Sequence, residues 1–318
     1  MSTPGPIFVA GVDRSGIGLL GELLDAHPAI AISRRTNFWS FYYQRFGDLE
    51  RPRNLERCVA EILRYSRMQA LQPNRDELLE ALRQERPTYA RLFAVMQEQH
   101  MRRLGKLRWG DKSLDTEGYA DTILREFPDA SIVHVIRDPR DRYASQATHR
   151  RAARGRVGSG IALWCWSVRH AQRNLARHPQ RYLVVRYEDL VTRPEETLRQ
   201  VCGFVGERFA PEMLDGAGDG PGAMSRDGDR RQFTAASIGR FRRDLRPRDI
   251  ALIDLVARRR MNELGYIVGP VGLSLRDALL LLVIDVPLNL ARMAVWWGRR
   301  AWSGWMGSRP ASRRIIGT

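Results

Sequence analysis

A glycine-rich turn near the start of the chain carries residue types that bind phosphate. The run Ile7–Val12 is short, apolar and β-branched, which predicts a buried strand. The turn Gly11–Gly18 follows, and leucines then recur at helical spacing. Strand, glycine turn and helix in this order direct backbone N–H groups and the positive end of a helix dipole at one point. The alternative is a glycine turn that binds no ligand.

This turn differs from the phosphate loop of nucleotide triphosphatases. That loop has the pattern Gly-x-x-x-x-Gly-Lys-[Ser/Thr], in which Lys reaches the outer phosphates and the hydroxyl binds magnesium. The spacing from Gly11 to Gly16 matches, but Ile17 and Gly18 stand at the Lys and Ser/Thr positions. The cation lies inside the loop, at Arg14. The turn is therefore suited to a phosphate or sulfate group that is handled without metal.

Two more predicted strands end in arginine-containing segments. Ile132–Ile136 precedes the sequence Arg-Asp-Pro-Arg-Asp, and Tyr182–Val185 precedes Arg-Tyr-Glu-Asp-Leu. The carboxyl ends of parallel strands meet at one edge of the sheet, where ligands bind. Arginine is suited to bidentate phosphate binding, so these segments are expected to converge on one polyanion. The alternative for Arg137 and Arg140 is ion pairing with neighbouring aspartates on a solvated loop.

The elements that position these motifs alternate between strands and helices. The first helix ends before Pro28, and Ile30–Ile32 is another short strand candidate. Residues 48–104 are polar and helix-prone, and we expect a helical insertion over a substrate cleft. A further helix is expected to end near Pro128. This alternation predicts an α/β fold, a parallel sheet flanked by helices with right-handed crossovers.

Length and composition narrow the class of protein. The 318 residues allow one large domain, taken as 1–270, and an appendage, 271–318. The net charge of +16 indicates an anionic partner, although no nucleic-acid motif is present and nucleic acid is not expected. Three distant cysteines give neither metal-ligand spacing nor a disulfide framework. Together with the lack of a signal-peptide pattern, they favour a cytoplasmic protein with buried cysteines.

Taken together, the motifs resemble the sulfotransferases that use 3′-phosphoadenosine-5′-phosphosulfate (PAPS), especially the tyrosylprotein and bacterial branch. The loop around Arg14 is similar to the family's P-R-S-G-T-T-L-L. Residues 127–145 look like the motif in which an Arg and a Ser hold the 3′-phosphate, here Arg137 and Ser145. Trp109-Gly-Asp-Lys-Ser resembles W-G-D-K-T, whose Lys contacts the phosphosulfate, here Lys112.

Later segments extend the resemblance over residues 6–266. Residues 182–198 look like Y-E-D-L…P-E-x-T-L, which implies that Tyr187 lies near the nucleotide. Residues 237–241 resemble the S-x-x-[RK]-W segment that closes over the nucleotide, with Arg240 as its cation. The resemblance implies a P-loop-like fold, PAPS as donor, 3′,5′-diphosphoadenosine (PAP) as product, no metal, and Arg14 and Lys112 as catalytic cations. The implied nucleotide-binding residues are Arg14, Ser15, Gly16, Ile17, Gly18, Lys112, Arg137, Ser145, Tyr187, Ser225 and Arg240.

The sequence departs from the family pattern where the chemistry takes place. The loop hydroxyls are replaced by Ile17 and Gly18, and the acidic residue that serves as general base is Arg35. An arginine stays protonated and cannot accept a proton. By sequence, His27 and Asp111 are the substitute bases. The alternatives are a structural helix-end role for His27 and an ion pair with Lys112 for Asp111.

Two functions from different classes follow. The first is transfer of a sulfuryl group from PAPS to a hydroxyl or amine on a small-molecule, carbohydrate or lipid-linked acceptor. The second is a catalytically inactive relative that binds nucleotide or a partner. The acceptor cannot be identified from this sequence.

The C-terminal appendage combines apolar residues, tryptophans and arginines. Its run Ala278–Ile284 stops at Asp285, and Pro287 and Arg292 follow, so it is expected to be too short and interrupted to span a membrane. Arginines interleaved with tryptophans suit an amphipathic helix on an anionic membrane surface, through residues 278–314. That would make the protein peripheral on the inner membrane face. The alternative is a helix packed on the core or across a homodimer.

Overall fold

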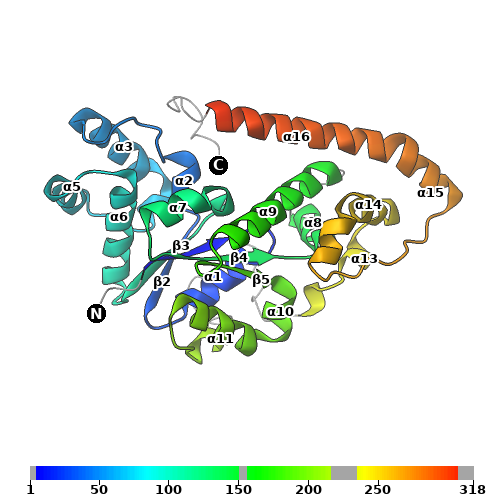
Figure 1. Cartoon of the computed structure of the whole chain (residues 1–318), viewed down its shortest axis with the longest axis horizontal. Coiled ribbons are helices and arrows are strands. Elements are labelled where there is room, and N and C mark those ends of the chain that lie inside the picture. The colour runs from blue at the N-terminus through cyan, green and yellow to red at the C-terminus, as the bar shows by residue number, and fades with distance from the viewer. Residues whose placement is uncertain (1–4, 150–155, 216–234, 307–318) are drawn as a thin grey trace.

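A computed structural model describes residues 5–149, 156–215 and 235–306. Its centre is a five-stranded sheet in the order β2-β3-β1-β4-β5, in which every pair of neighbours is parallel. Helices cover both faces of the sheet (Figure 1). The α/β fold predicted from the sequence is confirmed. The strands are β1 (Ile7–Ala10), β2 (Ile30–Arg34), β3 (Arg108–Lys112), β4 (Ser131–Ile136) and β5 (Tyr182–Arg186).

Four of these strands lie where apolar runs predicted them, and β3 was not predicted as a strand. Its sequence, Arg-Trp-Gly-Asp-Lys, has no apolar run or alternation, yet all five residues are buried. β3 forms a strand because it lies between β1 and β2 and pairs with both of them. A Cβ atom on Gly110 would lie 2.5 Å from the carbonyl oxygen of Ile7, so glycine is required at this close approach.

Two layers of helices enclose the sheet. On one face, α1 (Ile17–Asp25) and α11 (Pro194–Val205) pack leucines and valines against β1 and β4. Beyond the other face lie α9 (Val157–Arg177) and α14 (Pro247–Glu263), which share a second core with Ile136. Two helices follow strands closely: α8 (Pro139–His149) begins two residues after β4, and α10 (Tyr187–Thr192) begins directly after β5. The strand ends therefore lead into helices at one edge of the sheet.

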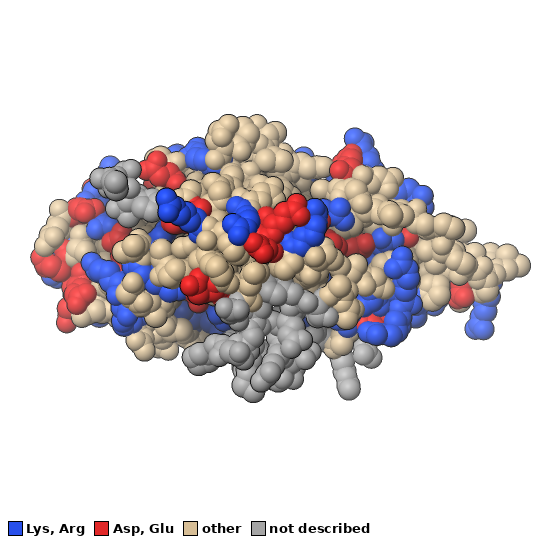
Figure 2. Space-filling view, turned by 90° about the horizontal axis from the view of Figure 1, so that it is seen from below, with Lys and Arg blue, Asp and Glu red and all other residues tan. Residues whose placement is uncertain are grey.

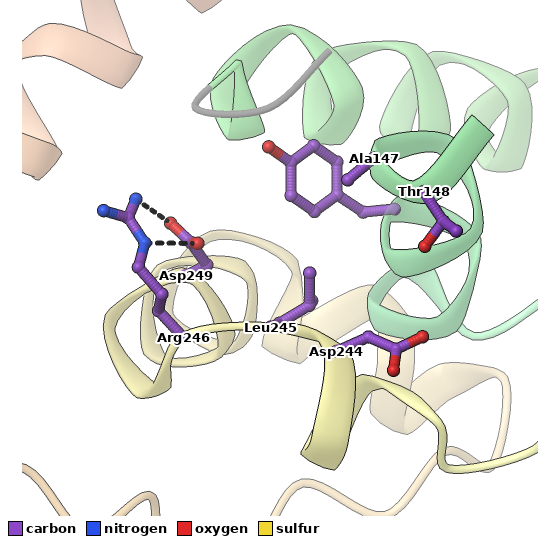
Figure 3. A pocket seen from close by; sticks show the side chains of 7 residues that line it. Ala147, Thr148, Asp244, Leu245, Arg246 and Asp249 are labelled. Atoms are coloured by element: carbon purple, nitrogen blue, oxygen red, sulfur yellow. Dashed lines mark hydrogen bonds and ion pairs between the residues drawn. The ribbon is translucent and has the colours of Figure 1, made fainter. Parts of the chain in front are cut away.

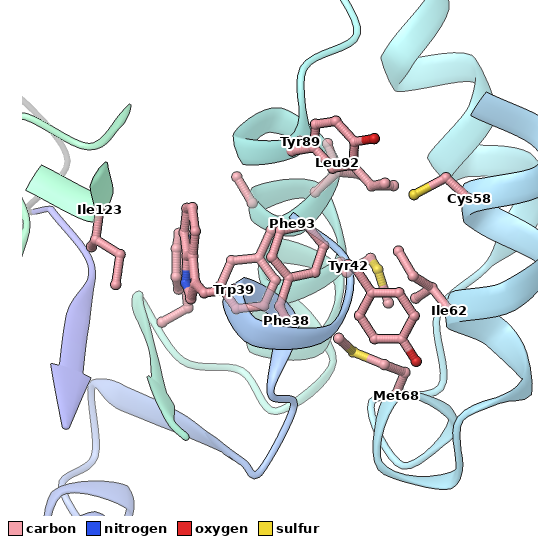
Figure 4. Packing of buried hydrophobic residues seen from close by; sticks show 14 of the residues in the cluster. Phe38, Trp39, Tyr42, Cys58, Ile62, Met68, Tyr89, Leu92, Phe93 and Ile123 are labelled. Atoms are coloured by element: carbon pink, nitrogen blue, oxygen red, sulfur yellow. The ribbon is translucent and has the colours of Figure 1, made fainter. Parts of the chain in front are cut away.

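The segment 48–104 is helical, as its sequence predicted. It contains α3 (Pro52–Arg64), α4 (Ser66–Gln69), α5 (Arg75–Gln84) and α6 (Tyr89–Arg103). An aromatic cluster joins these helices to α2 (Phe38–Phe41), and the Phe38 and Phe93 rings stack with centroids 4.6 Å apart (Figure 4). The same core includes Phe8 of β1. The insertion is thus anchored beside the end of β2. Cys58, Cys165 and Cys202 are buried, as expected.

The chain beyond α14 ends in one long helix. It consists of α15 (Leu275–Leu280), a π-helical turn (Leu281–Asp285) and α16 (Val286–Met306). The helix continues through residues 285–292, because the wider π-helical turn before Pro287 accommodates the proline ring. By length and composition alone, Leu275–Trp302 is long and apolar enough to cross a membrane.

Candidate functional site

The loop between β1 and α1 leaves a helix N-terminus and a buried hydroxyl without partners. Gly11 and Gly16 have φ values of 131° and 101°, which glycine adopts without steric cost. No side chain caps α1, and no acidic residue lies in its first turn. Ser15 is 1% exposed, and its Oγ has no hydrogen-bond partner. Because buried polar groups are normally satisfied, this arrangement is typical of a site that an anion completes.

Tyr187 closes one side of the loop. A Cβ atom on Gly16 would lie 2.3 Å from Cδ2 of Tyr187, so only glycine allows the tyrosine to pack here. The Tyr187 hydroxyl lies 2.7 Å from Oγ of Ser237, which ends a short 3-10 turn (Ala235–Ser237). The Arg137 guanidinium lies over the Tyr187 ring, 4.3 Å from its centroid. The end of β5 therefore meets the loop and the end of β4.

Arg14 points toward α8. Its Nε donates to Oγ of Ser145 at 2.9 Å, and its carbonyl oxygen accepts from Nη1 of Arg137 at 3.2 Å. Nη2 of Arg137 donates to the carbonyl oxygen of Ser237, and its buried Nε has no partner. We call Arg14, Arg137, Ser145 and Tyr187 the Arg137 side of the loop. The segments that follow β1, β4 and β5 therefore meet at one edge of the sheet, as the sequence predicted.

The alternative of local ion pairing describes Arg140, not Arg137. Arg140 Nη2 lies 2.7 Å from Oδ2 of Asp138, and its Nη1 lies 3.4 Å from Asp254. These groups are buried rather than solvated. Asp141 accepts hydrogen bonds from the backbone N–H groups of Gly239 and Phe241. The aspartates of this motif thus fix the local structure around Arg137.

Arg142 supports the loop from beneath, a role that sequence reasoning missed. Its side chain is 1% exposed, and its Nε donates to the carbonyl oxygen of Asp13 at 3.1 Å. Nη1 donates to the carbonyl oxygen of Gly160 at 3.3 Å, and the buried Nη2 has no partner. Burial lowers the Arg142 pKa to about 10. A buried cation close behind the loop favours a negatively charged ligand there.

Three charged residues lie on the other side of the loop. Nη2 of Arg35, just after β2, lies 3.5 Å from Oδ1 of Asp13, and both side chains are partly exposed. Lys112 ends β3, and its side chain packs against Gly21 of α1. Burial, followed by the charges of Arg35 and Arg34, lowers the Lys112 pKa to about 8. We call Asp13, Arg35 and Lys112 the Asp13 side.

The two substitute bases named from the sequence lie elsewhere. His27 follows the far end of α1, where its Nδ1 accepts from the Ala29 N–H and its Nε2 lies 2.9 Å from the Arg208 carbonyl oxygen. A nine-residue helix, about 14 Å long, separates it from the loop. These contacts match the structural alternative for His27.

Asp111 does not form the expected ion pair with Lys112. Successive side chains of a strand point to opposite faces, so neighbours on β3 diverge. Oδ1 of Asp111 accepts from the hydroxyls of Ser33 and Thr36 at 2.8 and 2.9 Å. The carboxyl group is fully buried, and burial raises its pKa. Asp111 therefore fastens β3 to β2 and to the segment after it, and lies away from the Asp13 side.

The structure shows no side-chain hydrogen bond to the loop for the remaining predicted residues that it describes. Ile17 and Gly18 are the first two residues of α1, so their backbone N–H groups belong to its first turn. Arg240 pairs with Asp244 at 2.7 Å and donates to Thr148 at 3.3 Å, and neither contact involves the loop. Ser225 lies outside the described residues.

A pocket of about 450 Å³ borders the Arg240 segment (Figure 3). The end of α8 and the turn before α14 line it. Arg246, the cation among its lining residues, makes two hydrogen bonds of 2.9 Å to Asp249. Asp244 adds a second carboxylate, so this pocket disfavours an anion. The loop, rather than this pocket, is the candidate site.

The known proteins that this chain resembles are sulfotransferases. A family model described as "Sulfotransferase family" matches residues 6–211. A sulfotransferase domain from the olefin synthase of Synechococcus PCC 7002 superposes with a TM-score of 0.58 at 20% identity, covering 85% of this chain and 98% of that one. The sulfotransferase domain of the curacin biosynthetic pathway gives 0.56 at 18% identity, with 85% and 100% covered. No curated protein matches the sequence.

Proposed function

Since the chain belongs to the sulfotransferase family, we propose that it is an enzyme that transfers the sulfuryl group of PAPS to a hydroxyl or amine acceptor. One observation carries the proposal. Residues from two distant segments, Arg14 of the loop and Arg137 and Ser145 after β4, meet beside a helix N-terminus that has no acidic residue in its first turn. The inactive-relative alternative is not favoured.

The residues around the loop fit a ligand with two separated anionic groups. On the Arg137 side, Arg137, Ser145 and Arg14 would hold the 3′-phosphate, and Tyr187 would lie beside the nucleotide. Here Arg14 is assigned to the 3′-phosphate because its guanidinium is directed at Ser145. The orphaned Ser15 hydroxyl and the first N–H groups of α1 would hold the 5′-phosphosulfate. When bound, PAPS supplies an activated sulfuryl group and a stable leaving group.

Asp13 takes the role of general base in this proposal. The family's acidic position is occupied by Arg35, but Arg35 pairs with a carboxylate that comes from the loop itself. Asp13 accepts the acceptor's proton as the acceptor oxygen bonds to sulfur and the bond from sulfur to the phosphate oxygen breaks. Lys112 and the N–H groups of α1 stabilise the charge that develops on the leaving oxygen. Arg35 holds the Asp13 carboxylate in place.

The function is tested by supplying purified protein with PAPS and a panel of hydroxyl and amine acceptors, including carbohydrates and lipid-linked alcohols. Release of PAP together with sulfated acceptor is the expected result. Binding of PAPS without transfer to any acceptor would instead support the inactive relative.

We expect PAP affinity to fall as pH rises through about 8. The Lys112 pKa is lowered to about 8, so its ammonium loses its proton above that pH and no longer attracts the ligand's 5′-phosphate. A bound anion would favour the ammonium form, so the dissociation constant should rise by up to about tenfold per pH unit. Titration calorimetry from pH 7 to 9.5 measures the dissociation constant of PAP. The Lys112→Arg variant stays charged over this range, so its PAP affinity should depend little on pH. If the variant showed the same pH dependence as the wild type, Lys112 would be ruled out as the cause.

We expect Arg35→Ala to reduce the transfer rate by roughly two- to fivefold, the range for a solvent-exposed ion pair. Arg35→Lys keeps the charge and should retain most of the activity, with PAP affinity unchanged in both. Arg35→Glu introduces the family's carboxylate but places it beside Asp13, so like-charge repulsion should lower the rate further. Steady-state kcat values measure these effects. A faster Arg35→Glu enzyme would show that position 35, not Asp13, accommodates the base.

A further inference from the structure

The outward face of the C-terminal helix is apolar from Leu275 to Trp302. Val283 is 70% exposed and Trp302 is 62% exposed, although both are large and hydrophobic. A helix of 32 residues is about 48 Å long, so this face is extensive. The other exposed members are Leu275, Leu279, Leu282, Ile284, Leu288, Leu290, Val295 and Trp297. Single exposed hydrophobic residues are ordinary, but a continuous stripe indicates a binding surface.

The polar side chain of Asn289, in the middle of this helix, faces the protein instead. Asn289 is 4% exposed, and its side chain accepts from the N–H of Gly158 in α9 at 2.8 Å. A Cβ atom on Gly158 would lie 2.4 Å from the Asn289 carbonyl oxygen, so the two backbones are in contact. A helix on a protein in water shows the opposite arrangement, with its polar side outward. The outward face is therefore suited to an apolar phase.

Ion pairs fasten both ends of the helix to the domain. Arg248 of α14 pairs with Asp277 and Asp285 at 3.5 and 3.3 Å. At the other end, Arg300 pairs with Asp115 at 2.7 Å, and its guanidinium lies 3.5 Å from the centre of the Trp166 ring. Between these attachments α16 packs against α9, and it lies above α9 in the view of Figure 1. The helix is held along the surface of the domain.

The charges near the outward face are positive. Arg276 and Arg299 are exposed near its two ends, whereas the helix carboxylates Asp277 and Asp285 are paired with Arg248. Elsewhere, positive and negative side chains are interleaved over the face seen in Figure 2. Cations flanking an apolar stripe that contains tryptophans complement an anionic bilayer surface.

We propose that the outward face of α15 and α16 docks on an anionic phospholipid bilayer, with the helix axis in the plane of the membrane. Crossing the bilayer would require the helix to leave α9 and break the pairs of Arg300 and Asp285, at the expense of burying unpaired charges. When the helix lies in the plane of the membrane, it keeps its contacts with the domain, and the bilayer covers only its apolar face. The proposal does not depend on the sulfotransferase reaction.

The test is sedimentation of the full-length protein with vesicles of phosphatidylcholine, with and without phosphatidylglycerol. Wild-type protein should bind the mixed vesicles more tightly than the neutral ones, and increasingly so at low salt. Leu282→Glu places a charge in the middle of the apolar face and should weaken binding at least tenfold. Leu107→Glu is the matched control, because Leu107 is 71% exposed just before β3 and should leave binding unchanged. The circular dichroism spectrum of each variant reports that the domain is folded.

Three results would overturn the proposal. One is wild-type protein that binds neither vesicle at low salt. Another is protein that stays in cell membranes after an alkaline carbonate wash, which indicates a spanning helix. The third is a dimer in solution that Leu282→Glu converts to a monomer without any vesicle binding, which would make a second copy the occupant of this face.

Discussion

Asp13→Asn should lower the rate of sulfuryl transfer by about 10²- to 10⁴-fold, the usual contribution of a general base. Asparagine preserves the size of the side chain but cannot accept the acceptor's proton. The backbone contact from Arg142 to the carbonyl oxygen of residue 13 does not involve the side chain and should persist. Single-turnover measurement with saturating PAPS isolates the chemical step, and PAP affinity should be nearly unchanged.

The control for this substitution is Asp121→Asn. Asp121 also pairs with an arginine near the surface, Arg177 at 2.8 Å, but lies in α7 (Ala120–Glu126), away from the loop. Its loss should leave transfer unaffected. An Asp13→Asn enzyme with wild-type rate would remove Asp13 from the mechanism. A parallel loss of PAP affinity and rate would instead assign Asp13 to the structure of the loop.

Arg137→Ala should weaken PAP binding by about tenfold or more and leave AMP binding nearly unaffected. A charge-assisted hydrogen bond contributes roughly 1.5–3 kcal/mol, and only PAP carries the 3′-phosphate. Titration calorimetry with both nucleotides measures the difference. The comparison matters because Arg137 also braces the carbonyl oxygens of Arg14 and Ser237. Loss of that bracing alone would weaken both ligands equally, which would contradict the assignment to the 3′-phosphate.

Arg199→Ala controls for the change in net charge. Arg199 lies on α11, is exposed, and pairs with Glu195 in the same helix. It also removes one positive charge from the protein, but at a distance from the loop. PAP affinity should therefore stay close to that of the wild type. Similar losses in Arg199→Ala and Arg137→Ala would mean that overall charge, rather than a specific contact, governs binding.

The sequence by itself determined four of the five strands, the glycine-rich loop after β1 and the meeting of the strand ends. Short β-branched runs predicted β1, β2, β4 and β5, because such residues favour buried strands. Gly16 was recognisable because the turn between strand and helix has a local backbone requirement. Once the strands were taken as parallel, Arg14 and Arg137 were bound to emerge at one edge. These inferences need only neighbours in the chain and a general rule of topology.

Tertiary structure decided the properties that depend on which distant residue lies nearby. β3 is a strand because β1 and β2 flank it, although its own sequence is polar. Arg35 looked like the loss of a base until the fold placed it beside Asp13. Asp111 and Lys112 adjoin in sequence, but the pleat of the strand separates their side chains.

The C-terminal helix illustrates the same division. Its sequence indicated apolar residues and cations, but it did not show which residues would face the protein. Contact with the bare backbone of Gly158 turns Asn289 inward, and the pairing of Arg300 with Asp115 fixes the far end. The rotation of the helix, and with it the exposure of Leu282 and Val283, follows from these contacts. Such choices rest on side-chain partners more than a hundred residues away, which no local pattern encodes.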